Sequence, residues 1–141
     1  MNSRPADRAA LEAAVTDFTD AFNRDDLEAV MGYFADDAVY DEYNGARWEG
    51  KAAIREAFAA MFRGEFGRIR FHTEDFFCDP DSGKALIRWL CTSEKGDRAG
   101  AWRGLDILHF EGGKLVQKLT YAKAKATQFR KKDTMGDDWP G

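Results

Sequence analysis

Residues 21–62 read AFNRDDLEAVMGYFADDAVYDEYNGARWEGKAAIREAFAAMF. The stretch begins with the end of one helix, and a short helix and an acidic turn follow it. A strand is expected over residues 38–42, and the Asn-Gly pair at residues 44–45 predicts a turn. Gly50 then precedes a further helix. This order of helix, strand, turn and helix indicates a fold that mixes α and β structure.

Three amphipathic helices are expected in the first half of the chain. In residues 9–24 apolar side chains recur at steps of three and four, which places them on one face. Asp25 is expected to cap the second helix, which ends near residues 35–37. The third helix follows Gly50. The apolar faces are Leu11, Val15, Phe18 and Phe22; Leu27, Val30, Met31 and Phe34; and Ile54, Phe58, Met61 and Phe62.

The second half of the chain changes to the pattern of strands. Glycine, aspartate and proline separate the segments, as expected for tight turns. Short connections between long strands predict an antiparallel meander. Three helices before such a meander indicate an α+β domain over residues 1–126, with a polar tail over residues 127–141 that is either mobile or docked through Trp139. The four expected strands are residues 68–78, 84–94, 101–110 and 114–124.

The composition excludes several classes of function. The net charge of -4 disfavours nucleic-acid binding, and no apolar run is long enough to span a membrane or to serve as a signal peptide. Cys78 and Cys91 have no metal-ligand spacing and are expected to be buried thiols in a reducing cytoplasm. No phosphate-binding loop or nucleophile elbow is present in the sequence. We therefore expect a cytoplasmic protein that uses neither a metal nor a cofactor.

Asp106 is the sharpest candidate for chemistry. Its strand predicts an inward face that is apolar around the carboxyl group, and burial of that kind is expected to raise the pKa of Asp106. The alternative is a salt bridge to Arg88 or Lys118 on the neighbouring strands. The residues that alternation places on one face are Trp102, Gly104, Asp106, Leu108 and Phe110.

This sequence resembles the nuclear transport factor 2-like superfamily, which includes the ketosteroid isomerases and the SnoaL-like polyketide cyclases. The resemblance rests on the order of elements in residues 21–62 and covers about residues 7–123. It implies a cystatin-like fold, in which a curved antiparallel sheet and three N-terminal helices form a cone around a pocket. It also implies a homodimer formed through the outer face of the sheet. Here Leu105 and Ile107, with Leu86 or Leu90, would form that face.

The resemblance also implies roles for two carboxyl groups. Asp106 matches an isomerase aspartate that stays protonated and donates a hydrogen bond to a developing oxyanion. Glu42 falls where the isomerases place their general base, and Asp41 competes with it because a one-residue slip would turn Asp41 inward. Alternatively, Asp41 and Glu42 form a solvated strand end beside Arg47 and Lys51.

One departure from the isomerases limits the resemblance. Phe18 stands where those enzymes carry a tyrosine in the oxyanion hole, so steroid double-bond isomerisation is not expected. Tyr121 is a candidate for the replacement hydroxyl. The residues expected to line the pocket are Phe18, Phe22, Tyr33, Trp89, Trp102, Leu108, Tyr121 and His72, within an aromatic set that also includes Trp48 and Tyr40.

Two functions remain open from the sequence. The first is a cofactor-free enzyme of the cyclase, isomerase or dehydratase type, which would use Asp106 with Glu42 or Asp41 on a small apolar carbonyl compound. The second is a dimeric domain that binds a small molecule and performs no chemistry. Epoxide hydrolysis is a weaker third option, since it would need an inward arginine, either Arg88 or Arg103.

Overall fold

The structure is a computed structural model and describes residues 7–123. The tail expected over residues 127–141 lies outside the described residues, so the domain boundary at residue 126 stays a prediction. The helices are α1 (Arg8–Asn23), α2 (Leu27–Gly32) and α3 (Lys51–Phe62). The strands are β1 (Phe34–Asp41), β2 (Arg47–Glu49), β3 (Arg68–Asp79), β4 (Lys84–Lys95), β5 (Arg98–Glu111) and β6 (Lys114–Ala122).

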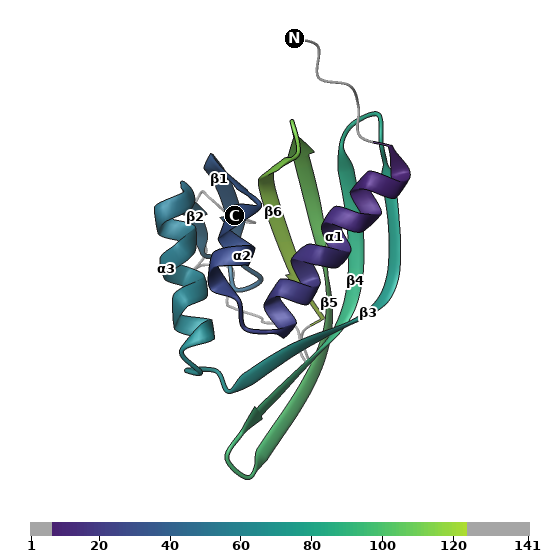
Figure 1. Cartoon of the computed structure of the whole chain (residues 1–141). Coiled ribbons are helices and arrows are strands. Elements are labelled where there is room, and N and C mark those ends of the chain that lie inside the picture. The colour runs from purple at the N-terminus through teal and green to yellow at the C-terminus, as the bar shows by residue number, and fades with distance from the viewer. Residues whose placement is uncertain (1–6, 124–141) are drawn as a thin grey trace, which may run out of the picture.

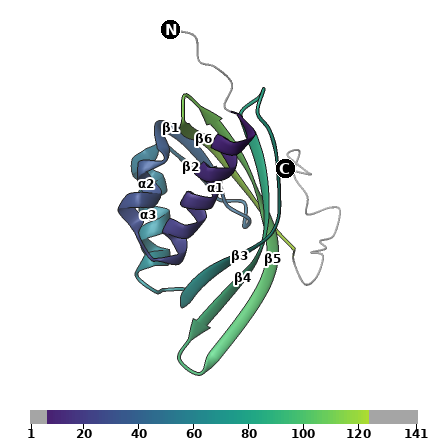
Figure 2. The same cartoon turned by 45° about the vertical axis from the view of Figure 1, so that its right-hand side comes forward.

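The six strands form one sheet in the order β2-β1-β6-β5-β4-β3. Neighbouring strands are antiparallel, except that β1 runs parallel to β6. The sheet curves strongly, and the three helices gather on its inner face (Figures 1 and 2). The expected α+β architecture is therefore confirmed, and the four strands of the second half form the antiparallel meander that the turns predicted.

The start of α2 differs from the expectation. Asp26, and not Asp25, caps the helix, because its side chain accepts a hydrogen bond from the backbone N–H of Ala29 at 3.0 Å. Asp25 instead adopts a left-handed conformation with a φ of 58°. Its carboxylate pairs with Arg70 on β3 at 3.0 Å, which ties the turn between α1 and α2 to the sheet.

The first edge of the sheet also differs from the expectation. Strand β1 begins at Phe34, four residues before the expected start, because Phe34 already pairs with Leu115 of β6. Both side chains are almost fully buried, so tertiary packing takes Phe34 out of the helix in which the sequence pattern had placed it. Strand β2 was not predicted. A strand of three residues is too short to show alternation.

The core lies between α1, α3 and the inner face of the sheet. The ring of Phe22 on α1 makes edge contacts with Phe18 and Phe58 at centroid distances of 5.1 Å, and with Phe71 of β3 at 5.7 Å. Edge-to-face pairs of this kind add about 0.5–1.5 kcal/mol each to the free energy gained by burial. The aromatic cluster fixes α1 and α3 at a distance from the sheet that leaves a cavity between them.

The outer face of the sheet carries an apolar row. Strand register aligns Phe77 with Leu86, Leu86 with Ile107, and Ile107 with Leu119. Phe77 is 54% exposed. The helices cover the opposite face, so within residues 7–123 nothing packs over this row (Figure 2). Separately, no helix within the described residues is long and apolar enough to cross a membrane.

The homodimer stays a prediction, and the apolar row supports it. A two-fold contact through this face would bury the row on both copies. Light scattering at micromolar concentration is expected to give about twice the mass of the 15.9 kDa chain. Exchanging Phe77 and Ile107 for serine is expected to shift the protein toward the monomer. A monomer mass for the unchanged protein would contradict the expectation.

A glycine on β5 gives a second prediction. Gly104 pairs with Trp89, and a Cβ atom at Gly104 would lie 2.5 Å from the Trp89 ring and against the Tyr121 carbonyl. Gly104→Ala is therefore expected to lower the free energy of unfolding by about 1–3 kcal/mol through overpacking. On the same strand, a Cβ atom at Gly100 would enter open space. Urea unfolding should show a change within about 0.5 kcal/mol for Gly100→Ala, and equal losses for both variants would refute the explanation.

Candidate functional site

A cavity of about 170 Å³ lies between α1, α3 and the inner face of the sheet. Its wall is mostly apolar, and a small set of polar groups interrupts it. Tyr43 and Phe66 are more than half exposed and still line the cavity, so they mark its opening. The polar lining residues are Thr19, Tyr40, Glu42, Asn44, Asp106, Lys118 and Thr120. The remaining lining residues are Phe18, Phe22, Phe58, Met61, Ile69, Phe71, Ile87, Trp89, Cys91, Trp102 and Leu108.

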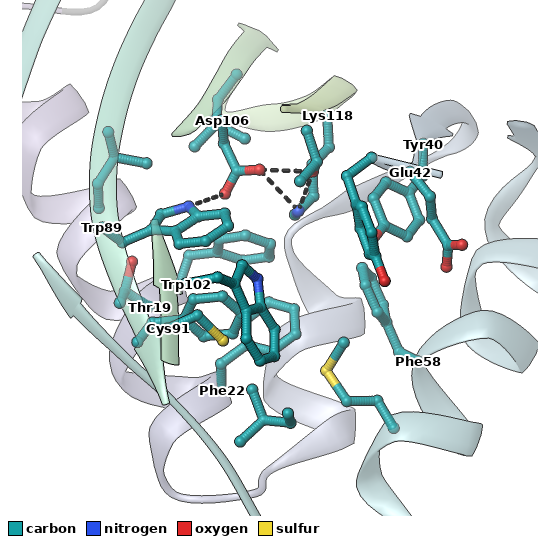
Figure 3. Close-up of a pocket in the computed structure, with 18 of the residues that line it drawn as sticks. Thr19, Phe22, Tyr40, Glu42, Phe58, Trp89, Cys91, Trp102, Asp106 and Lys118 are labelled. Atoms are coloured by element: carbon teal, nitrogen blue, oxygen red, sulfur yellow. Dashed lines mark hydrogen bonds and ion pairs between the residues drawn. The ribbon is translucent and has the colours of Figure 1, made fainter. Parts of the chain in front are cut away.

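Strand register brings the polar groups together. Asp106 of β5 pairs with Thr120 of β6, and Tyr40 of β1 pairs with Lys118 of β6. Because paired residues of neighbouring strands point to the same face, all four side chains lie on the inner face. Trp89 of β4 reaches the same place from the other side of β5 (Figure 3).

Three donors surround the Asp106 carboxylate. Its Oδ1 accepts hydrogen bonds from Lys118 Nζ at 3.0 Å and from Thr120 Oγ1 at 2.6 Å. Its Oδ2 accepts from Trp89 Nε1 at 3.1 Å (Figure 3). The sequence allowed for a salt bridge from Asp106 to Lys118 as an alternative to an inward position. The structure shows that Asp106 faces the cavity and also pairs with Lys118. The Asp106 and Lys118 side chains are only 10% and 7% exposed, and both line the cavity.

The two oxygens of Asp106 differ in what they can still accept. Each oxygen of an ionised carboxylate has about two acceptor positions. Oδ1 uses two of them, whereas Oδ2 uses one, so Oδ2 keeps a position for a ligand. All three partners donate to Asp106. The carboxylate therefore acts here as an acceptor, and not as the donor that the resemblance implied.

Lys118 is fully engaged. An ammonium group has three N–H donors. Two of them go to Asp106 Oδ1 at 3.0 Å and Thr120 Oγ1 at 2.8 Å. On the remaining side the ammonium lies 4.6 Å from the centroid of the Tyr40 ring, which is the distance of a cation–π contact. Lys118 therefore neutralises the buried carboxylate, and an aromatic ring lies on the remaining side of its ammonium group.

Tyr40 supplies a hydroxyl that the sequence did not single out. Burial raises the pKa of the Tyr40 phenol well above its usual value, and the negative charges of Glu42 and Asp106 raise it further. The nearby Thr120 hydroxyl acts in the opposite direction and has a smaller effect on this pKa. The phenol therefore keeps its proton at neutral pH and can donate it to an oxygen. Tyr40 lies two residues before Glu42, and alternate residues of an extended chain point to the same face. This spacing was the signal that could have identified Tyr40.

The structure distinguishes Glu42 from Asp41. Glu42 lines the cavity, whereas Asp41 points away from it and pairs with Arg47 at 3.0 Å. In Figure 3 the Glu42 carboxylate lies apart from the group around Asp106, and no contact joins the two carboxylates. The expected solvated strand end therefore describes Asp41 and not Glu42.

Five of the residues expected to line the pocket do so, and three do not. Tyr121 is a correction, because it is 56% exposed on the outer face while its neighbour Thr120 points inward. His72 is also exposed, with a ring nitrogen 3.2 Å from Thr92 Oγ1. Tyr33 packs its ring against Phe18 from outside the cavity, at a centroid distance of 5.6 Å. The other five, which do line the cavity, are Phe18, Phe22, Trp89, Trp102 and Leu108.

The cavity thiol is unsuited to nucleophilic chemistry. Burial, with a further contribution from the charge of Asp106, raises the pKa of Cys91 to about 12. At neutral pH the thiolate is therefore almost absent, and the thiolate is the reactive form. Within residues 7–123 no group of three histidine, cysteine, aspartate or glutamate side chains is placed to hold a metal ion.

Solved structures with the same fold give the first comparison. A candidate polyketide cyclase from Xanthomonas campestris matches with a TM-score of 0.69 and 18% identity, over 81% of this chain and 90% of its own. A protein of unknown function from Mesorhizobium loti, described as NTF2-like, matches with a TM-score of 0.70 and 22% identity, over 88% and 97%. TerC, which was crystallised with polyporic acid, matches with a TM-score of 0.70 and 14% identity, over 81% and 92%.

These likenesses establish the nuclear transport factor 2-like, or cystatin-like, fold. No curated protein matches the sequence significantly. The profile of the SnoaL-like domain matches residues 15–118, which run from α1 to Lys118 and so include most of the cavity. Since this match spans well over half of the 141 residues, the chain belongs to the SnoaL-like domain family.

Proposed function

We propose that this protein is a cofactor-free enzyme that moves a proton on a small, largely apolar carbonyl compound, in a reaction of the cyclase, isomerase or dehydratase type. One observation carries the proposal. A buried carboxylate lines an apolar cavity and keeps an open acceptor position on Asp106 Oδ2. A base in such a place can remove a proton next to a carbonyl group, and general base catalysis contributes about 10²–10⁴ in rate.

The neighbouring groups support this role for Asp106. Trp89 and Thr120 hold the carboxylate in one orientation, and Lys118 balances its charge. When Oδ2 takes the proton, the electron pair of the C–H bond moves onto the carbonyl oxygen and an enolate forms. The neutral phenol of Tyr40 is the donor available to that oxygen. Return of the proton to another atom of the ligand completes the reaction.

Glu42 is the second proton carrier in this proposal. It lines the cavity directly after the end of β1, the strand that carries Tyr40, and lies beside the turn that carries exposed Tyr43. A carboxylate there can exchange its proton with solvent more easily than the buried carboxylate of Asp106. The comparisons agree with use of the cavity for small molecules, because similar folds include candidate polyketide cyclases and a protein crystallised with polyporic acid.

A binding protein without catalysis is the second candidate. Asp106, Lys118 and Thr120 already hydrogen-bond one another, so their burial is explained without a chemical reaction. In addition, Phe18 of α1 lines the cavity and has no hydroxyl that could donate a hydrogen bond to an oxyanion. The two candidates differ in whether a bound ketone exchanges its α-protons.

The test uses 1-tetralone, a flat ketone with slowly exchanging α-protons, in deuterated buffer. The unchanged protein is expected to accelerate exchange, as followed by proton NMR. Asp106→Asn should reduce the acceleration by about 10²–10⁴, because the base is lost. Tyr40→Phe should reduce the acceleration by about tenfold, because the enolate oxygen loses one hydrogen bond.

The matched control is Asp41→Asn, since Asp41 lies on the same strand as Tyr40 and points away from the cavity. This variant should exchange the ketone at the unchanged rate. Binding of 1-tetralone without accelerated exchange would reject the enzyme and favour the binding protein. Acceleration that survives in Asp106→Asn would reject Asp106 as the base.

A further inference from the structure

The hairpin of β4 and β5 extends beyond the end of β6 (Figures 1 and 2). Strand β5 pairs with β4 along the whole length of β4. Its pairing with β6 reaches only as far as Gly104, and one further hydrogen bond joins Lys123 N to Arg103 O at 2.8 Å. Within residues 7–123, residues 98–102 of β5 therefore have a partner strand on one side only.

The open edge of β5 presents backbone hydrogen-bonding groups. Arg103 directs its carbonyl toward β6, because that oxygen accepts the bond from Lys123. Alternate residues of an antiparallel strand direct their N–H and C=O groups to the same side, so Ala99 and Ala101 direct theirs to the open edge. An edge of this kind is a template for pairing with another extended chain.

The sequence that follows β6 continues the pattern of a strand. Residues 121–127 read YAKAKAT, in which small apolar and polar residues alternate. A period of two is typical of a strand with one covered and one solvated face. No glycine or proline, the residues that most often mark a turn, occurs in residues 114–135. The sequence pattern therefore favours continuation of the strand past the last residue of β6.

The register of β5 and β6 can be continued past Lys123 residue by residue. It places Lys125 opposite Ala101 and Thr127 opposite Ala99. The N–H groups of both incoming residues would be directed at β5, as the N–H group of Lys123 is. The two alanines are the edge residues whose backbone groups have no strand partner within residues 7–123.

The same register suits the side chains of the inner face. Ala124 would lie opposite Trp102, whose half-buried ring needs a small neighbour. The next pair of strands shows the same rule, because Trp89 of β4 lies opposite Gly104 of β5 and its ring occupies the space that a Cβ atom there would need.

On the outer face, Lys125 would find a carboxylate without a cation. Glu94 of β4 is paired with Ala99 in the sheet, is exposed and forms no salt bridge within residues 7–123. The alanine side chains at residues 99 and 101 are too short to separate Lys125 from Glu94. Opposite charges on neighbouring strands stabilise their pairing.

We propose that residues 124–128 dock on the open edge of β5 and extend β6 alongside residues 98–102. The occupant of this edge is the C-terminal segment of the same chain, and neither a second copy nor a separate protein. The chain continues to residue 141, so it is long enough to cover the edge, and the bond at Lys123 delivers it at the correct register. A tethered segment also has a high effective concentration. Docking removes an edge on which other chains could pair.

Two cysteine pairs test the register in the full chain. Gly100→Cys with Ala126→Cys places two thiols opposite each other, and a Cβ atom at Gly100 enters open space. Facing Cα atoms of such a pair lie about 4.5 Å apart, within the range of a disulfide. The matched control is Gly100→Cys with Lys125→Cys, because Lys125 would point to the other face. With oxidised glutathione, the first pair should form a disulfide within one chain about tenfold or more faster than the control, as located by peptide mapping.

Amide exchange followed by NMR tests the hydrogen bonds without a cysteine. In the unchanged chain the N–H groups of Ala99 and Ala101 should be protected from exchange. Lys125→Pro removes a donor of the ladder and should accelerate their exchange by about tenfold or more. Ala126→Pro is the matched control, because the N–H group of Ala126 would point away from β5. Its exchange rates should stay close to those of the unchanged chain.

Four results would overturn the proposal. Exchange of Ala99 and Ala101 at the rate of unprotected amides would show that the edge stays open. Equal cross-linking of the two cysteine pairs would reject the register. A disulfide between two chains, or protection that grows with protein concentration, would assign the edge to a second copy. Protection that survives Lys125→Pro would assign it to another segment or partner.

Discussion

The buried ion pair between Asp106 and Lys118 is the constraint on which the inner face of the sheet depends. Its contacts connect four neighbouring strands, because Trp89 of β4 donates to Asp106 of β5, Lys118 of β6 pairs with it, and Tyr40 of β1 lies under the ammonium. Each of these strands must keep its register for the group to stay satisfied. A shift by one residue would turn a charged side chain outward and leave its partner buried and alone.

Such a pair is an unusual way to fill a protein interior. Removing two charges from water costs several kcal/mol per ion, so well-packed apolar residues of the same volume often give equal or greater stability. The pair at Asp106 and Lys118 also borders a cavity, where it leaves one acceptor position unused. Ligand binding therefore explains the buried pair more simply than stability does. The pair also provides the proposed base, Asp106, and sets the charge that a ligand meets.

Most of the fold could be predicted from the sequence, because helix periodicity and strand alternation are local signals. Prediction from the sequence fails where a contact with a residue far along the chain determines the local structure. Phe34 continues the apolar pattern of a helix, yet its pairing with Leu115 makes it the first residue of a strand. Strand β2 exists only through its pairing with β1. Likewise Asp26 caps α2 while Asp25 turns to meet Arg70, a residue 45 positions away.

The site could be predicted in part for the same reason. Alternation placed Asp106, Trp102 and Leu108 inward correctly, because one strand is enough to decide the face. Whether Lys118 or Tyr121 shares that face depends on the register between β5 and β6, which no single strand reveals. Tyr121 was expected in the cavity and is on the outer face, whereas Thr120 and Lys118 are inside.

A double-mutant cycle on the ion pair is the most direct test of this account. Urea unfolding would be measured for Asp106→Leu, Lys118→Met and the double variant. Each single change should cost about 3–5 kcal/mol, because it leaves one buried charge unpaired, and the double variant should be more stable than either single variant. The solvated pair of Asp41 and Arg47, measured in the same way, should show a coupling below about 1 kcal/mol. If the losses at Asp106 and Lys118 simply add, the two charges do not depend on each other and the account is contradicted.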